Sequence, residues 1–197
     1  MSRGKLVVFA VLFEGGLVGV ALGLGWLCNQ PPLPHLHWDT TDFSLGIAAT
    51  LPMLAGLFLC LRATFRPLVR IKNLLYEIVG PLFRGCSTAE LALISILAGL
   101  GEEMLFRGVL QGLFTRWLTI WGGIVAVNIL FGLLHMVTPA YAVVAGLAGF
   151  YLSCLHLWRG NLLAVIVPHA LFDLVALVYI VRRRVPLEPG NASSPMS

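Results

Sequence analysis

The sequence is poor in charge. Of its 197 residues, 11% are Asp, Glu, Lys or Arg, whereas ordinary soluble domains carry about 25%. By contrast, 58% of the residues are hydrophobic and the mean hydropathy is +0.91. This composition excludes an ordinary soluble domain and predicts an integral membrane protein. The net charge of +4 is modest and comes from scattered loop residues, so we expect no nucleic-acid partner.

The sequence also lacks the common metal-binding and disulfide signatures. Its four cysteines lie far apart and form no CxxC pair, and no HExxH motif is present. We interpret the cysteines as small apolar residues in or near helices. They are Cys28, Cys60, Cys86 and Cys154.

Long apolar runs dominate what is present. Each run can cross a hydrocarbon core of about 30 Å at about 1.5 Å per residue. The first is too long for the hydrophobic part of a secretory signal, about 7–15 residues, so we expect an uncleaved anchor helix. The fold class predicted is therefore all-α, a polytopic membrane helical bundle of about six transmembrane helices. The runs are 6–28, 43–61, 88–115, 119–137, 140–158 and 161–181.

The chain divides into three parts. Residues 1–87 hold two transmembrane helices and a basic loop, residues 88–184 form a helical core, and residues 185–197 are predicted to be a disordered tail. Within the basic loop, residues 68–75 predict a short helix on the membrane surface. Ser87 or Thr88, followed by Glu90, is a plausible N-cap for the third transmembrane helix.

The distribution of basic residues predicts the orientation. If the N-terminus lies in the cytoplasm, ten Lys and Arg residues fall on the cytoplasmic side and two outside, with Arg107 buried. Positive charge concentrates on the cytoplasmic side of membrane proteins. We therefore expect a multi-pass protein with both termini in the cytoplasm, most simply in a bacterial inner membrane.

Two adjacent carboxylates, Glu102 and Glu103, and the cation Arg107 interrupt the third apolar run. A charge facing lipid at a helix centre costs about 2.5–3.5 kcal/mol, so such residues are functional candidates. Glu103 and Arg107 share a helix face at i and i+4 and are expected to pair. Glu102 is rotated by about 100° and has no cation on its own helix. Unpaired and desolvated, it suits a general base working near neutral pH.

Two further polar patterns lie in the fourth and sixth runs. Phe131 and His135 share a helix face, as do His169 and Asp173. The histidines could orient a water, bind a metal or stabilise an oxyanion, and Asp173 could fix the tautomer of His169 or reach the substrate. Asn128, seven residues before His135 and on the same face, is expected to line the pocket.

Taken together, the three motifs resemble those of the CPBP intramembrane proteases, the group that contains the CAAX prenyl endopeptidases and bacteriocin-processing or self-immunity proteins. The resemblance covers roughly residues 88 to 178. The motifs EExxxR, FxxxH and HxxxD occur here in order as Glu102–Arg107, Phe131–His135 and His169–Asp173.

The resemblance implies hydrolysis of a peptide bond inside or beside the membrane. Glu102 would activate the attacking water with help from His135, and His169 and Asp173 would bind the developing oxyanion. The prenyl-protease branch carries Asn where this chain has Asp173. Because an ionised Asp cannot donate a hydrogen bond, it would be protonated, act through His169, or ligate a metal.

Within the same resemblance, Glu103 and Arg107 would mainly give structural support. A cofactor is not required, because Glu102 alone can serve as the base. A zinc ion is the alternative, since two His and a carboxylate form a ligand set with an open position. The ligands would be His135, His169 and either Asp173 or Glu102.

Other functions remain open at this point. The expected partners are the lipid bilayer and a peptide or protein substrate, such as a prenylated CAAX peptide or a leader or sorting signal. The alternative is a non-catalytic membrane scaffold or a bacteriocin self-immunity protein of the same fold. A small transporter could use buried carboxylates as a proton relay, but no inverted repeat is visible. Glu14, alone in the first run, has no assigned role.

Overall fold

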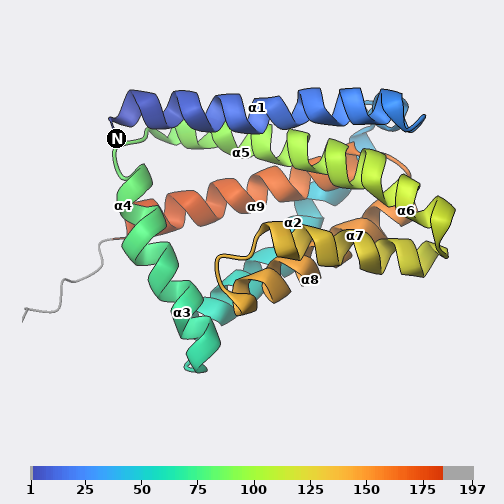
Figure 1. Cartoon of the computed structure of the whole chain (residues 1–197). Helices are drawn as coiled ribbons and strands as arrows, with labels where there is room; N and C mark the ends of the chain where they lie inside the picture. The colour runs from blue at the N-terminus through green and yellow to red at the C-terminus, as the bar shows by residue number, and fades with distance from the viewer. Residues whose placement is uncertain (1, 184–197) are drawn as a thin grey trace, which may run out of the picture.

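The computed structural model describes residues 2–183 and, over that range, contains helices and no strands. It confirms the all-α membrane bundle (Figure 1). The tail predicted at residues 185–197 lies outside the described residues. The elements of the first half are α1 (Arg3–Leu27), η1 (Leu33–His35), α2 (Thr40–Arg62), α3 (Arg66–Leu74), η2 (Leu75–Val79) and α4 (Gly80–Phe83).

The second half contains the sequence motifs. Its first three elements follow one another without a break, so that residues 88–117 form one helix (Figure 1). The elements are α5 (Thr88–Glu103), η3 (Met104–Leu110), α6 (Gln111–Trp117), α7 (Ile120–Leu134), α8 (Pro139–Arg159) and α9 (Leu163–Arg182).

Each of the six predicted apolar runs forms a helix. Helices α1, α2, α8 and α9 are long and apolar enough to cross a membrane. The helix over residues 88–117 is long but carries the charged motif. Helix α7 has 15 residues, roughly 22 Å at about 1.5 Å per residue, which is shorter than a bilayer core. The fourth predicted transmembrane helix therefore ends early, just before His135.

One end of the bundle gathers the start of α1, the start of α5 and the end of α9 (Figure 1). Ser87, one of the two residues predicted as the N-cap, caps α5 through a reciprocal capping box with Glu90. Arg3 of α1 pairs with Glu90 at 2.7 Å. Arg182 of α9 donates to the Cys86 carbonyl at 3.2 Å. The start of α1 and the end of α9 therefore lie at the same end of the bundle.

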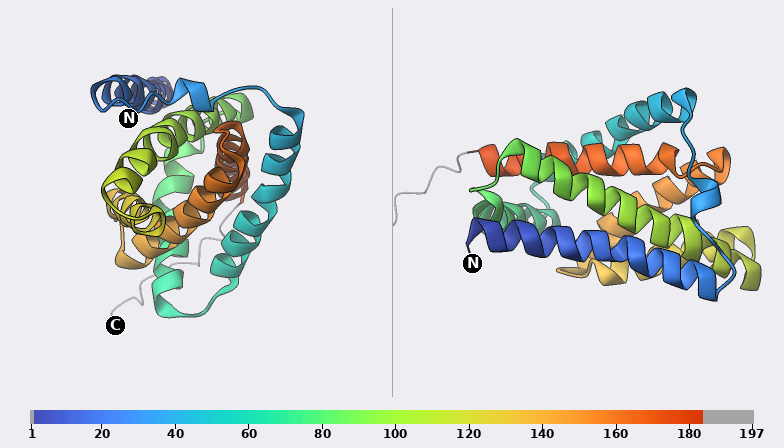
Figure 2. Two further views of the ribbon diagram at one scale, coloured as in Figure 1. Left: turned by 90° about the vertical axis from the view of Figure 1, so that its right-hand side faces the viewer. Right: turned by 90° about the horizontal axis from the view of Figure 1, so that it is seen from above.

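The predicted helix at residues 68–75 also forms, within the longer segment from α3 through η2 to α4. This segment runs crosswise to α1, α5 and α9 (Figures 1 and 2). Ile71 is buried on its inner face, whereas Arg70 and Asn73 are exposed. Such an amphipathic character is typical of helices lying at a membrane surface.

The opposite end is held by polar contacts around Asp42, in the first turn of α2. Asp42, which is 3% exposed, binds Arg159 at 2.5 Å and the side-chain amide of Asn161 at 2.8 Å. The same Asn161 amide nitrogen donates to the carbonyl of His37 at 3.0 Å. These contacts join the start of α2 to the turn between α8 and α9.

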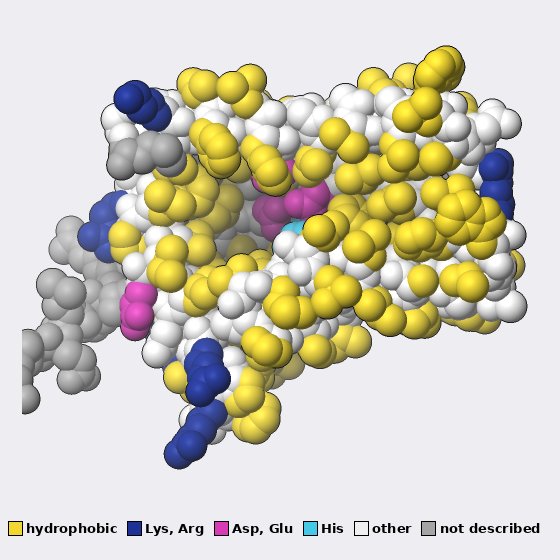
Figure 3. All heavy atoms as spheres, viewed as in Figure 1, with side chains coloured by type: hydrophobic (Ala, Val, Ile, Leu, Met, Phe, Trp, Pro, Cys, Tyr) yellow, Lys and Arg dark blue, Asp and Glu magenta, His cyan; other side chains and the backbone are white. Residues whose placement is uncertain are grey.

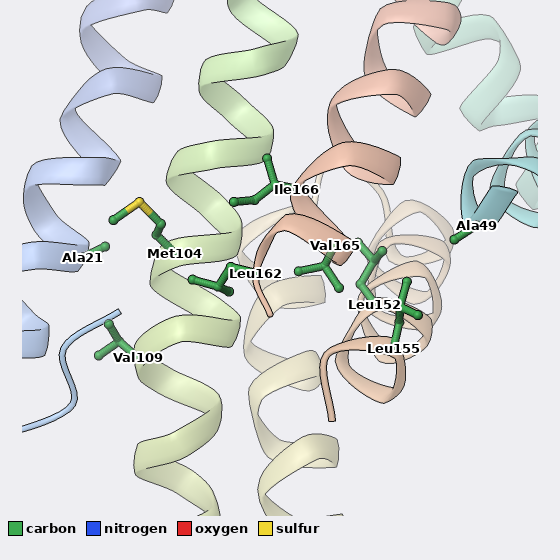
Figure 4. Close-up of a cluster of buried hydrophobic side chains, with 9 residues drawn as sticks. All are labelled: Ala21, Ala49, Met104, Val109, Leu152, Leu155, Leu162, Val165 and Ile166. Carbon is green, nitrogen blue, oxygen red and sulfur yellow. The ribbon is translucent and has the colours of Figure 1, made fainter. Parts of the chain in front are cut away.

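Helix α9 packs between α2 and α5 in the interior (Figure 2). A close approach makes this possible at Gly99 of α5, where an added Cβ would lie 3.0 Å from the backbone nitrogen of Ala170. A hydrophobic cluster fixes α9 and α8 against η3 and α1 (Figure 4). Its members are Ala21, Ala49, Met104, Val109, Leu152, Leu155, Leu162, Val165 and Ile166.

Candidate active site

A cavity of about 620 Å³ opens between the helices. In Figure 3 it is the hollow between α1 and α5 on one side and α8 on the other, with acidic side chains and a histidine at its floor. Its walls are mainly apolar and come from α1, α2, α3, α5, α8 and α9. The carboxylates among the lining residues are Glu14, Glu102 and Asp173. The acidic side chains thus lie at the bottom of an otherwise apolar cavity.

The helix that carries both glutamates changes its geometry at the site. Helix α5 ends at Glu103, and the next seven residues, Met104–Leu110, form the π-helical turn η3. π-Helical turns are rare and frequently occur at functional sites. Sequence reasoning gave no sign of this turn, because its residues are ordinary helix formers within one apolar run.

Glu103 lies behind the cavity and is fully enclosed. One of its oxygens, Oε1, accepts from Arg107 Nη1 at 2.9 Å and lies 2.6 Å from His169 Nδ1, and its side chain is 0% exposed. The predicted pair of Glu103 and Arg107 is confirmed. The contact with His169 was not predicted, because it joins α5 to α9 and depends on tertiary packing.

Arg107 is the centre of a network that we call the buried polar network: Glu103, Arg107, Asn128, Gly149 and Ser153. Arg107 Nη2 donates to the Gly149 carbonyl at 2.7 Å and to Asn128 Oδ1 at 3.4 Å. Asn128 in turn donates to Ser153 Oγ at 2.8 Å. Asn128 was expected to line the pocket, but it lies behind the site and holds Arg107. Its role is therefore to support the guanidinium group.

Glu102 has a different environment from its neighbour. Its Oε2 lies 3.7 Å from His135 Nε2 and 3.9 Å from His169 Nε2. The side chain is 13% exposed, and Oε2 makes no hydrogen bond with the protein. These distances are too long for direct hydrogen bonds and are suited to a small molecule between the groups.

His135 stands at the end of the short helix α7, which brings it level with Glu102. Its Nδ1 lies 2.8 Å from the Phe131 carbonyl, and its ring stacks on the Phe131 ring with centroids 4.3 Å apart. A carbonyl oxygen only accepts, so Nδ1 carries the proton. Nε2, which faces Glu102, is then free to accept a hydrogen bond.

His169 is oriented from the other side. Because Glu103 accepts from Nδ1, the Nε2 atom faces Glu102 and also lies 3.5 Å from Asp173 Oδ2. The Nδ1 proton of His169 is therefore held by Glu103 and not by Asp173. Asp173 is 30% exposed and lines the cavity, which leaves it able to reach a bound molecule.

Two other residues enter the site from outside the motifs. Tyr141, near the start of α8, lines the cavity with its ring 6.5 Å from that of His135. Glu14 of α1 lines the same cavity. Sequence reasoning missed Tyr141, since nothing in its surroundings marks it as polar machinery. A lone carboxylate in an apolar run was the available signal for Glu14.

The zinc ion considered as an alternative would be held by His135, His169 and either Asp173 or Glu102. Over residues 2–183, no group of three or more His, Cys, Asp or Glu side chains is arranged so that it could hold a metal ion. Glu103 and the Phe131 carbonyl bind the two histidines at Nδ1 and leave both Nε2 atoms facing Glu102, as outer-shell groups also do in metal sites. No step below is routed through a metal.

Comparison with protein families bears on the motif region. Residues 84–175 match the family of Rce1-like type II CAAX prenyl endopeptidases. The comparisons with curated proteins and with solved structures found no match. The family match runs from just before α5 into α9 and contains every motif residue from Glu102 to Asp173. It confirms the resemblance to CPBP proteases and supports endopeptidase activity in general, in an integral membrane protein.

Proposed function

We propose that this chain, with its CPBP-type core, is an intramembrane endopeptidase that hydrolyses a peptide bond of a membrane-associated substrate with Glu102 as general base. One observation carries the proposal. The Nε2 atoms of His135 and His169 converge on the same oxygen of Glu102, at 3.7 and 3.9 Å. That oxygen is buried and unpaired at the floor of a cavity large enough for a peptide segment.

The first step is activation of water. A water held between Glu102 Oε2 and His135 Nε2 has acceptors on both sides, so its oxygen lone pair can point into the cavity. Glu102 takes a proton from this water as the oxygen attacks the carbonyl carbon of the peptide. The carbonyl π bond breaks and its oxygen becomes the oxyanion of a tetrahedral intermediate.

The second step is stabilisation of that charge. His169 donates Nδ1–H to Glu103, and when Nε2 also carries a proton it donates to the oxyanion. Asp173 Oδ2 lies 3.5 Å from Nε2 and helps to orient this imidazole. Asp173 thus acts through His169, one of the roles left open by the sequence.

The third step is departure of the amine. The intermediate collapses, the carbon–nitrogen bond breaks, and Glu102 returns its proton to the leaving nitrogen. The products are a new carboxylate and a new amino terminus, and Glu102 is ready for another turn. Glu103 and Arg107 stay paired throughout, because their charges cancel inside a fully enclosed site.

The family match and the cavity support a proposal for the substrate class. Prenylated CAAX peptides have an apolar chain next to a peptide to be cut, and the apolar walls of the cavity suit such a group. A leader or sorting signal with apolar side chains fits the same walls. We propose a substrate of this kind, with no cofactor required.

The orientation is part of the proposal. We propose that the end formed by the starts of α1 and α5 and the end of α9 lies in the cytoplasm, because positive charge concentrates on the cytoplasmic side of membrane proteins. The crosswise α3–α4 segment, with Arg70 exposed, then lies at the cytoplasmic membrane surface. A bacterial inner membrane fits this arrangement.

The test compares cells carrying wild-type protein with cells carrying Glu102→Ala at matched membrane levels. New N- and C-termini are sequenced in the membrane and secreted fractions. We expect a set of termini that is present with the wild type and lost in the variant. The matched control is Glu77→Ala, since Glu77 is exposed on η2 and lies away from the cavity. It should preserve the wild-type termini.

Identical termini in wild-type and Glu102→Ala cells would contradict the protease proposal. If the variant also kept every wild-type phenotype, the non-catalytic scaffold or self-immunity protein would be the better account.

A further inference from the structure

Glu14 of α1 is a cavity residue to which neither the motifs nor the proposed mechanism gives a role. It lies outside the region that matches the protease family, residues 84–175. It lines the same cavity as Glu102 and Asp173. A carboxylate in the middle of an apolar helix is costly, so its presence calls for a partner or a function.

The packing of α1 against α5 fixes the position of Glu14. At Gly101, an added Cβ would lie 2.6 Å from the carbonyl oxygen of Glu14 and 2.9 Å from Leu17 Cβ. A glycine is therefore required where the two helices touch, one residue before Glu102. This close contact brings Glu14 to the level of the glutamate proposed as the base and prevents α1 from sliding along α5.

Among residues 2–183, Glu14 has no hydrogen-bond or ion-pair partner. Its Oε2 is buried and makes no hydrogen bond, and none of the ion pairs among residues 2–183 includes it. Arg107, the buried cation of the EExxxR motif, already binds Glu103 and the Gly149 carbonyl in the buried polar network. Glu14 is thus an unpaired carboxylate in the lining of the cavity.

The cavity as a whole has an excess of negative charge. Its described lining contains Glu14, Glu102 and Asp173 against a single Lys or Arg, Lys72 on α3. Inside apolar walls the attraction between opposite charges is much stronger than in water. A ligand that brings a positive charge to the cavity floor therefore gains more than a neutral ligand of the same shape.

From these observations we propose that Glu14 is a specificity-determining residue whose carboxylate binds a cationic Lys or Arg side chain of the peptide, near the bond to be cut. The inference rests on the proposed peptide-binding role of the cavity. It assigns to α1, a helix outside the matched region, the selection of the substrate's charge, whereas the motif helices perform the hydrolysis.

The test measures binding and not cleavage, so that it is separable from the proposed activity. Two synthetic apolar peptides are used, identical except for one central residue, Lys in one and the uncharged norleucine in the other. Their affinities are measured for the full chain in lipid nanodiscs, in the background of Glu102→Gln and in the double variant Glu102→Gln with Glu14→Gln. Comparing ratios between the two proteins cancels the difference in membrane partitioning of the peptides.

For each protein we take the ratio of its affinity for the Lys peptide to its affinity for the norleucine peptide. In the Glu102→Gln protein, which keeps Glu14, this ratio should be at least about ten times the ratio in the double variant. Glu14→Lys should reverse the preference in favour of a peptide with a central Glu. A matched control, Glu77→Gln in the same background, should leave the ratio unchanged, because Glu77 is exposed on η2.

An equal Lys-to-norleucine ratio with and without the Glu14 carboxylate would overturn the inference, and so would an unchanged preference in Glu14→Lys. Size-exclusion profiles of each variant verify that the bundle is intact. Because binding is measured with the base replaced, a protein that binds with this preference but never cleaves would refute the protease proposal alone.

Discussion

The cavity floor and the buried polar network differ in one respect that matters for function. Glu102, at the floor, is 13% exposed and its Oε2 has no bonded partner. Glu103, the next residue, is 0% exposed and binds both Arg107 and His169 through one oxygen. The two side chains share chemistry and helix but not environment, because a step of one residue turns the helix by about 100°. Pairing, and not residue type, therefore distinguishes the supporting glutamate from the glutamate proposed as the general base.

The largest expected effect comes from removing the cation of the buried polar network. Arg107→Met removes the guanidinium partner of the buried Glu103 carboxylate and leaves only its contact with His169. Breaking a buried ion pair in this way typically costs about 3–5 kcal/mol of stability. We expect a large fall in the thermal midpoint of the detergent-solubilised protein. Arg116→Met is the matched control, since Arg116 is exposed and its loss should change stability by less than about 1 kcal/mol. Equal midpoints for both variants would show that the network is not a stabilising unit.

A smaller effect is expected from Asn128→Ala. This change removes the bond to Ser153 and one of the groups that hold Arg107, while the Gly149 carbonyl keeps its bond. Loss of such a buried polar contact costs about 1–3 kcal/mol. Chemical denaturation in detergent should show it, whereas Asn73→Ala, at an exposed site on α3, should not. A wild-type midpoint for Asn128→Ala would place Asn128 outside the supporting network.

Asp173→Asn tests whether the charge of the Asp173 carboxylate at the cavity is needed for cleavage. An amide is uncharged but can donate a hydrogen bond to an oxyanion directly. We therefore expect peptide cleavage within about ten-fold of the wild-type rate, since a direct hydrogen bond from the amide to the oxyanion replaces the contribution that Asp173 makes through His169. Asp173→Leu, of similar size and unable to donate, should lose more. Initial rates on one peptide decide the matter, and an Asn variant as slow as the Leu variant would show that the charge itself is required.

The smallest expected effect is that of metal removal. Because no described group of three ligating side chains is arranged for a metal, cleavage should change by less than about two-fold after treatment with a chelator or on addition of zinc. The measurement is the initial rate before and after each treatment. A loss with chelator that zinc restores would make the metal-dependent alternative correct.

The sequence predicted much of this architecture because apolar length and helical periodicity are local properties. The six helices, the capping box at Ser87 and the pair of Glu103 with Arg107 all follow from spacing along one chain segment. Contacts between helices could not be predicted in the same way. The bond of His169 to Glu103 and the position of Asn128 behind the site depend on how α5, α7, α8 and α9 pack.

The relative depth of Glu102 and His135 in the bundle is a second feature that depends on how the helices pack. At about 1.5 Å per residue, Glu102 lies about 21 Å along its helix, whereas His135 lies near the cytoplasmic end of its run. From the sequence, either the third helix begins well inside the cytoplasm or the fourth ends within the membrane, before Pro139. The structure brings them within 3.7 Å, because α7 ends at Leu134 and stops short of a full crossing. The role of α1 was hidden as well, since only the close contact at Gly101 shows that Glu14 stands at the level of Glu102.

The most direct test of the account is a comparison of purified wild-type protein with Glu102→Gln, on one apolar peptide in ¹⁸O-labelled water. The account predicts that the wild type cuts the peptide and places ¹⁸O in the new carboxyl group. In the variant the rate should fall by about 10²–10⁴, the range for loss of a general base, with the thermal midpoint unchanged because Glu102 has no partner to lose. Cleavage by Glu102→Gln at the wild-type rate would contradict the central claim.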